Sequence, residues 1–118
     1  MPAYNYEDEN GDVLYRVVRY GEKNFRQEHP DNNNGGWEKG RDVPNDKPYH
    51  LTEVLAGIDS GKPIWIFEGE KDVETARLQD LIATCNSGGA GKWNDDISNW
   101  LRGAEPVLIC WDNDPEGR

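Results

Sequence analysis

Residues 64–67, Ile-Trp-Ile-Phe, form an unbroken apolar run with turn residues on both sides. Such a run predicts a strand buried on both faces. Glu68 follows it directly, and Gly69 permits a tight turn into a polar segment that can begin a helix. A second apolar run, residues 106–111, ends in Asp112-Asn113-Asp114. Open α/β sheets bind ligands at the carboxyl edge of their strands, so both runs are expected to deliver acids to one ligand-binding edge.

The other periodic segments from residue 51 onward predict short helices and strands in alternation. Residues 51–60 predict a helix with Thr52 as N-cap and a stop at Gly61. The remaining segments are an amphipathic helix at 71–81, a strand at 82–85, and a helix capped by Asn94 before the last strand. Strand, helix, strand, helix, strand implies a parallel sheet with right-handed crossovers.

The first fifty residues have a different, β-rich pattern. Residues 3–8 and 13–20 flank an Asn-Gly turn signal and predict a hairpin, and residues 23–27 suit a third short strand. Residues 37–48 are polar and broken by proline, which predicts an irregular connector. The predicted fold class is therefore α/β, with a parallel-sheet core over residues 51–118 and a small N-terminal β-hairpin region over residues 1–50.

Length and charge limit the function classes. The 118 residues suit one domain, or one domain with a small appendage. A net charge of −10 argues against a chain that binds nucleic acid by itself, although basic neighbours or a divalent metal would permit it. No stretch has the ~18–20 apolar residues of a membrane helix and no apolar leader opens the chain, so we expect a soluble cytoplasmic protein.

The cysteines and histidines add no metal-binding pattern. Cys85 and Cys110 are too few and too isolated for a disulfide framework or a zinc site, and buried free thiols are expected. His29 and His50 have no partner at metal-ligand spacing and are expected at the surface.

One basic-aromatic segment interrupts the acidic composition. Tyr20 and Phe25 are interleaved with four cations, which are Arg16, Arg19, Lys23 and Arg26. Such a patch can face a nucleic-acid strand. The alternative is a solvated edge strand that charge protects from pairing with other chains.

The acids after the two buried strands predict the chemistry. If Glu68, Asp112 and Asp114 converge, each pair ~4 Å apart repels by about 4 kcal/mol at an effective dielectric near 20. Such a cluster persists by raising a pKa or by binding a cation, and oxygen ligands favour Mg²⁺ or a similarly hard ion. The expected reactions are phosphoryl or nucleotidyl transfer and phosphodiester hydrolysis. Glu68 can also act as a general acid or base if its pKa is raised.

Two other motifs are incomplete. Residues 112–117 resemble the opening of an EF-hand loop, but an apolar strand precedes them and Pro115 intrudes. The glycine-rich loop over residues 86–93 lacks the first glycine of a P-loop and has Trp93 in place of its Ser or Thr. As a backbone-amide nest beside Lys92, with Gly89 and Gly91, this loop can still hold a phosphate, and a plain turn is the alternative.

Together, Glu68-Gly-Glu-Lys-Asp72 and the later Asp112-Asn-Asp114 with Gly117 resemble the TOPRIM domain. That domain is shared by bacterial replicative primases, topoisomerases and certain nucleases. The resemblance implies a Rossmann-like sheet that holds Mg²⁺ or Mn²⁺, with Glu68 catalytic, Asp112 and Asp114 binding metal, and Asp72 supporting them.

The glycine-rich loop and the N-terminal segments make the chain look like primase-type TOPRIM proteins of phages and mobile elements. The segments are Tyr-x-Tyr at 4–6, Asn-Gly at 10–11 and Phe-Arg-Gln at 25–27. The family usually continues past its second acidic motif with another helix and strand, so the sheet is expected to be incomplete at its C-terminal side.

Two hypotheses of different classes follow. The first is a Mg²⁺-dependent, primase-like domain that acts on nucleic acid and nucleotides within a larger protein or complex. The second is a catalytically silent acidic protein that occupies the nucleic-acid groove of a basic partner. Metal uptake that depends on Asp112 and Asp114 separates them.

Overall fold

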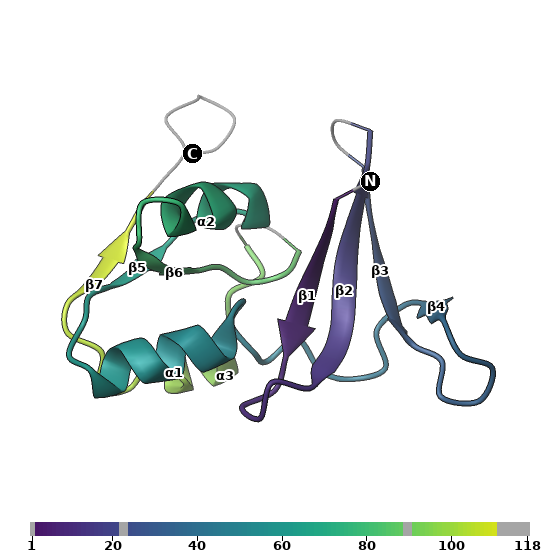
Figure 1. The fold of residues 1–118 in the computed structure, drawn as a ribbon, viewed down its shortest axis with the longest axis horizontal. Coiled ribbons are helices and arrows are strands. Elements are labelled where there is room, and N and C mark those ends of the chain that lie inside the picture. Colours follow the sequence, from purple (N-terminus) through teal and green to yellow (C-terminus); the bar gives the residue numbers. More distant parts are fainter. Residues whose placement is uncertain (1, 22–23, 89–90, 111–118) are drawn as a thin grey trace.

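The computed structural model describes residues 2–21, 24–88 and 91–110, which form two small sheets and three helices (Figure 1). The N-terminal elements are β1 (Ala3–Glu7), β2 (Val13–Tyr20), β3 (Asn24–Pro30) and β4 (Trp37–Lys39). The C-terminal elements are α1 (Leu51–Asp59), β5 (Ile64–Ile66), α2 (Glu70–Arg77), β6 (Ile82–Thr84), α3 (Asp95–Asn99) and β7 (Val107–Ile109).

The N-terminal sheet is antiparallel, with the order β1-β2-β3-β4. The predicted hairpin and third strand are confirmed. The connector predicted to be irregular instead contributes β4, in which Trp37 pairs with Pro30 and Lys39 with Glu28. The three residues of β4 are too few to show an alternating pattern, so this strand depends on its partner rather than on its own sequence.

The C-terminal sheet is parallel, with the order β6-β5-β7, so the strand after Pro63 is central. The register aligns Ile64 with Ile82 and Val107. The predicted alternation of strands and helices is therefore confirmed as an α/β fold. The helix predicted over 71–81 is shorter in the structure, where α2 ends at Arg77. Asp80 adopts a left-handed backbone with a φ of 62°, which does not continue a right-handed helix.

Side chains alternate between the two faces of the parallel sheet. Ile64 and Ile66 pack with Val54 of α1 and with Leu101, which follows α3. Trp65 faces the other way, toward α2 and the N-terminal sheet. Figure 1 shows α1 and α3 on one side of this sheet and α2 on the other. The predicted burial on both faces is complete only at Ile64, whereas Trp65 and Ile66 are half-buried.

The predicted N-cap is confirmed for α3 and is wrong for α1. Asn94 accepts a hydrogen bond from the N–H of Ile97 and caps α3 as expected. The cap of α1 is His50 rather than Thr52, and His50 is left-handed with a φ of 56°. Thr52 lies inside the helix, where its hydroxyl donates to the Glu7 carboxylate at 2.6 Å.

The cysteines and histidines differ in burial and in hydrogen bonding. Cys85 is buried and Cys110 is half-buried, and both are free thiols. The two histidines, expected at the surface, are half-buried and bonded: Nδ1 of His29 lies 2.9 Å from the Gly40 oxygen, and Nε2 of His50 lies 2.6 Å from Oε2 of Glu74. Within the described ranges, no helix combines the length and apolar character needed to cross a bilayer.

Candidate functional site

Glu68 lies at the carboxyl edge of the parallel sheet, in the turn between β5 and α2. Gly69 has an extended backbone and caps α2, so the chain reverses from strand to helix within a few residues. Glu68 is half-buried and lines two cavities, one on each side of this turn. The sequence prediction of a carboxylate at this edge of the central strand is thus met by the geometry.

The first cavity, of about 490 Å³, lies beside β7 and has mostly apolar walls. Cys110, the residue after β7, lines it together with Glu68. The N–H of Cys110 donates to the oxygen of Ile66 at 2.8 Å, so the ends of β5 and β7 lie side by side. The remaining lining residues are Ile66, Phe67, Asn86, Trp93, Ser98, Leu101, Val107 and Ile109.

The predicted acids fall partly outside the described residues. Asp112 and Asp114 lie beyond Cys110 and outside them, and Asp72 is exposed in the first turn of α2. Among residues 2–21, 24–88 and 91–110, no group of three or more His, Cys, Asp or Glu side chains is placed to hold a metal ion. The described part of the candidate metal site is therefore Glu68 with Asp72 nearby in sequence.

The second cavity, of about 510 Å³, lies between the two sheets. One wall comes from β2 and β3 of the N-terminal sheet. The other comes from the Glu68 turn and the start of the glycine-rich loop. The lining residues are Val17, Phe25, Gln27, Glu68, Gly69, Glu70 and Gly88. Glu68 thus lines a cavity whose other wall belongs to the N-terminal sheet.

The predicted basic patch is divided between the two faces of the N-terminal sheet. Directly opposed residues of an antiparallel pair share a face, and Arg16 opposes Glu28 in the register. Arg16 and Arg26 both form ion pairs with Glu28, at 2.8 and 3.0 Å. Arg19 opposes Phe25, which lines the second cavity, so Arg19 lies on the cavity face.

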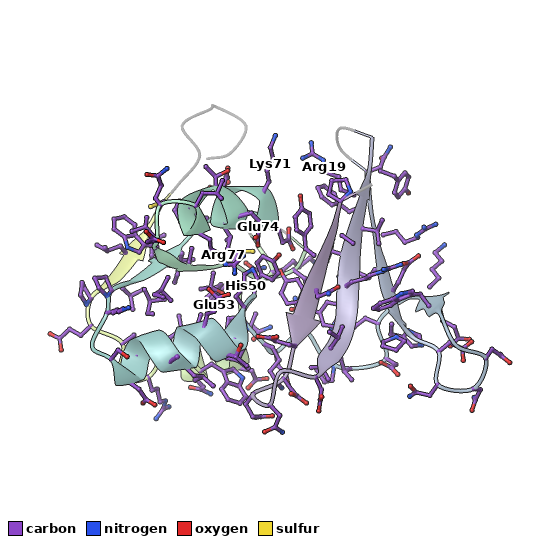
Figure 2. The ribbon with its side chains drawn as sticks, viewed as in Figure 1. Arg19, His50, Glu53, Lys71, Glu74 and Arg77 are labelled. Carbon is purple, nitrogen blue, oxygen red and sulfur yellow. The ribbon has the colours of Figure 1, made fainter. Side chains whose placement is uncertain are left out.

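Of the four predicted cations, Lys23 is outside the described residues. A cation that the prediction did not include, Lys71, is exposed on α2. Figure 2 shows Lys71 and Arg19 projecting toward the same end of the molecule from different halves.

The glycine-rich loop begins at the same edge of the sheet. Gly88 is left-handed with a φ of 86°, and a Cβ there would lie 3.0 Å from the Lys92 side chain. Gly91 and Lys92 are exposed, and Gly89 lies outside the described residues. The aliphatic part of Lys92 therefore packs against Gly88, whose left-handed backbone favours glycine.

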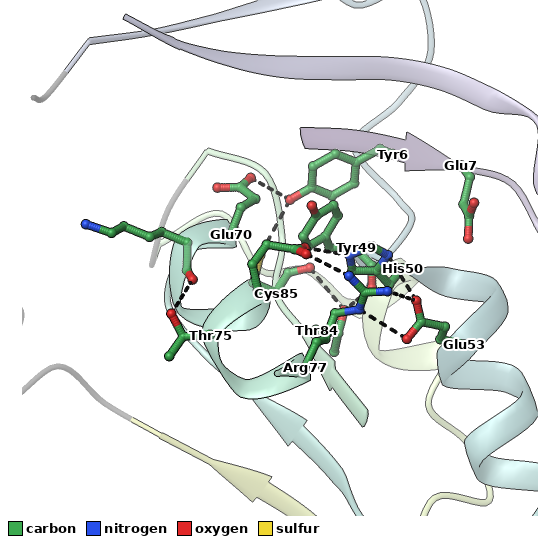
Figure 3. Close-up of polar contacts among 12 residues, drawn as sticks. Tyr6, Glu7, Tyr49, His50, Glu53, Glu70, Thr75, Arg77, Thr84 and Cys85 are labelled. Carbon is green, nitrogen blue, oxygen red and sulfur yellow. Dashed lines mark hydrogen bonds and ion pairs between the residues drawn. The ribbon is translucent and has the colours of Figure 1, made fainter. Parts of the chain in front are cut away.

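A buried polar cluster beside Glu68 was not predicted. Glu70 is 8% exposed, and its Oε2 accepts a hydrogen bond of 2.7 Å from the hydroxyl of Tyr6, which is fully buried. The same hydroxyl lies 3.6 Å from Sγ of Cys85 (Figure 3). Glu70 precedes the buried Val73 by three residues, and this helical spacing is the signal that could have placed it on the inner face of α2.

Burial dominates the ionisation of this cluster. Loss of solvent raises the pKa of Glu70, although the hydrogen bond from Tyr6 opposes the rise. Burial also raises the pKa values of Tyr6 and Cys85 well above their ordinary ranges, and the nearby Glu70 charge adds to both. The cluster therefore favours neutral side chains.

A separate ionic network joins the two long helices away from this edge. Arg77 of α2 binds Glu53 of α1 through two nitrogens, at 3.2 and 2.6 Å, and binds Glu74 at 2.7 Å. His50 approaches the other oxygen of Glu74 (Figures 2 and 3). The Arg77 guanidinium is already paired with two carboxylates of the chain, so we assign this network to holding α1 against α2.

Comparison with protein-family models and with curated proteins gives no match to this chain. The functional assignment therefore depends on the residues and their geometry.

Proposed function

We propose that the chain is a Mg²⁺-dependent, TOPRIM-type domain of a nucleic-acid enzyme, with primase-like nucleotidyl transfer as the reaction class. The supporting observation is the position of Glu68. It follows the central parallel strand and shares a cavity with Cys110, the residue that follows the neighbouring strand. Asp112 is two residues beyond Cys110 in the sequence.

The candidate ligands suit a hard divalent cation. Glu68, Asp112 and Asp114 would hold it, with Asp72 in support, and all four offer only oxygen ligands. When bound, Mg²⁺ or Mn²⁺ would supply charge stabilisation on a phosphoryl oxygen. Glu68 is half-buried at the cavity wall, and we assign it the role of general acid or base toward the reacting hydroxyl.

The second cavity gives the nucleic acid a place to approach Glu68. Phe25 is 51% exposed on its N-terminal wall and offers an aromatic face for a base. Arg19 lies on the same face, and Lys71 is exposed on α2. We assign these two cations to the phosphate backbone and Lys92 to a nucleotide phosphate. The net charge of −10 favours action together with basic domains or subunits. We propose a cytoplasmic location for this assembly.

Metal titration tests this proposal directly. Calorimetry with Mn²⁺ and Mg²⁺ should show uptake at micromolar to millimolar concentration by the intact chain. The Asp112→Asn/Asp114→Asn variant should lose this uptake, and Glu68→Gln should weaken it.

The matched control is Asp59→Asn/Asp80→Asn, which removes the same two charges. Asp59 ends α1, and asparagine tolerates the left-handed backbone of Asp80. This control should bind metal as the unaltered chain does. Absence of uptake by the unaltered chain would remove the proposal and favour the acidic binding protein instead.

A further inference from the structure

We propose that Tyr6 and Tyr15 are positioning residues that hold two loops of the candidate site in fixed relation to each other. One loop is the turn that carries Glu68, and the other is the start of the glycine-rich loop at Ser87. What these loops bind depends on the function proposed above, but the positioning itself depends only on the contacts within the chain.

The two tyrosines form one rigid unit in the N-terminal sheet. Tyr6 of β1 and Tyr15 of β2 are directly opposed in the register. Their rings stack with centroids 5.0 Å apart and planes 4° apart. Both side chains are fully buried between the two sheets. Their rings therefore have little freedom, and the direction of each hydroxyl is fixed by the packing.

The Tyr6 hydroxyl fixes the Glu68 turn. It donates to Oε2 of Glu70 at 2.7 Å, and Glu70 is two residues after Glu68 at the first position of α2. It also lies 3.6 Å from Sγ of Cys85, which directly follows β6. One hydroxyl from the N-terminal sheet thus contacts the chain after both β5 and β6, as Figure 3 shows.

The Tyr15 hydroxyl fixes the second loop. It lies 2.9 Å from Oγ of Ser87 and 3.3 Å from Oδ1 of Asn45. Asn45 completes a closed set of bonds, since its amide donates to the Ser87 carbonyl at 3.1 Å and its Oδ1 accepts from Ser87 Oγ at 3.0 Å. Ser87 is fully buried and immediately precedes Gly88.

The hydroxyls distinguish this arrangement from ordinary core packing. Two phenylalanines would fill the same space without the cost of burying polar groups. Instead, the Tyr6 hydroxyl is bonded to Glu70 at the start of α2 and also lies near Cys85. The Tyr15 hydroxyl is bonded to Ser87 in the second loop. The stacked rings therefore fix the distance between the Glu68 turn and the loop that leads to Lys92.

Hydrogen exchange of the intact chain tests the proposal through Tyr6→Phe and Tyr15→Phe. Tyr6→Phe should speed amide exchange at residues 67–70 and leave residues 86–88 unchanged, and Tyr15→Phe should do the reverse. Tyr20→Phe is the control, because Tyr20 is 42% exposed on the other face of β2. Equal changes in both loops, or none in either, would overturn the proposal.

Metal affinity adds a functional measurement. Tyr6→Phe should weaken Mn²⁺ binding by about tenfold, the lower end of the effect of losing hydrogen bonds around a metal site. Tyr15→Phe should leave it nearly unchanged. If the unaltered chain takes up no Mn²⁺, the proposed function fails while the exchange pattern still decides the role of the tyrosines.

Variants of Glu70 give the same comparison if Tyr6→Phe does not fold. Glu70→Gln keeps an acceptor for the Tyr6 hydroxyl and should retain slow exchange at residues 67–70. Glu70→Ala removes the acceptor, and amide exchange at residues 67–70 should become faster. Identical exchange in these two variants would contradict the role of the hydrogen bond.

Discussion

The two cysteines differ in burial, and we expect them to differ in thiol reactivity. Cys85 is fully buried beside Tyr6 and Glu70, and burial raises the pKa of its thiol well above the ordinary value. Because the thiolate is the reactive form, a buried neutral thiol reacts slowly. Cys110 is half-buried and lines the first cavity.

We therefore expect one rapidly labelled thiol per native chain. An alkylating reagent at neutral pH should modify Cys110 first, and Cys85 should react only after denaturation. Mass spectrometry of the labelled peptides measures this order. Rapid labelling of Cys85 in the native protein would contradict the buried cluster.

His29 is a local pH-sensitive contact of the β3–β4 hairpin. Its hydrogen bond with the Gly40 carbonyl is the main cause that raises its pKa, and Asp42 and Glu38 add to the rise against partial desolvation. Since the folded pKa is raised, the stabilisation is complete below the ordinary value of about 6.5 and is lost as pH rises through the folded value.

An NMR titration should accordingly give His29 a midpoint above the ordinary value. Exchange of the Gly40 amide, corrected for intrinsic rates, should quicken as pH passes that midpoint. His29→Gln should remove this pH dependence. A midpoint at or below the ordinary value would show that the Gly40 bond does not favour the charged ring.

At the scale of elements, α1 lies very close to the parallel sheet at Gly57. A Cβ at this position would lie 3.1 Å from two carbons of Ile82 and 3.3 Å from Ile64. Since Ile64 is fully buried, the side chains have little room to move.

Gly57→Val should therefore destabilise the protein by about 1–3 kcal/mol through overpacking. Ala56→Val is the matched control on the exposed face of α1, and its cost should stay below about 0.7 kcal/mol from helix propensity. Denaturant unfolding of both variants measures the difference. If the two variants had equal free energies of unfolding, the sheet would have to move to make room for the added side chain at position 57.

The elements that could be predicted are those with strong local signals. The apolar run at residues 64–67 gave the central strand to within one residue, and Asn94 gave the cap of α3. β4 and the left-handed cap at His50 depend on contacts with distant residues, so no local pattern marks them. Tertiary contacts determined these features.

In the candidate site too, some residues have local sequence signals and others depend on contacts with distant residues. Glu68 could be predicted because its strand and turn have clear signals. Glu70 lies in a polar segment where only its helical spacing from Val73 indicates an inner position, and its partner Tyr6 is 64 residues away in the sequence. The basic patch was predicted from sequence proximity, whereas strand alternation places Arg16 and Arg19 on opposite faces.

At the scale of the whole molecule, the two sheets share one core. Tyr6, Tyr15 and Val17 of the N-terminal sheet pack with Val73 of α2 and Ala83 of β6. Residues 1–50 and 51–118 differ in secondary structure, but neither buries these side chains alone. We therefore expect the two parts to unfold together.

Val17→Ala tests this expectation. Loss of two buried methyl groups should cost about 2 kcal/mol, and the unfolding curves from far-UV circular dichroism and from tryptophan fluorescence should shift by the same amount. A shift in one curve alone would show that the sheets unfold independently.

The bond between Tyr6 and Glu70 also has an evolutionary consequence. Phenylalanine at position 6 would leave a buried carboxyl group without the hydroxyl donor described for it. Natural variants of this chain that lose the phenol should therefore replace Glu70 with a smaller or apolar residue in the same lineage. Two positions in opposite halves of the sequence would thus covary as a pair.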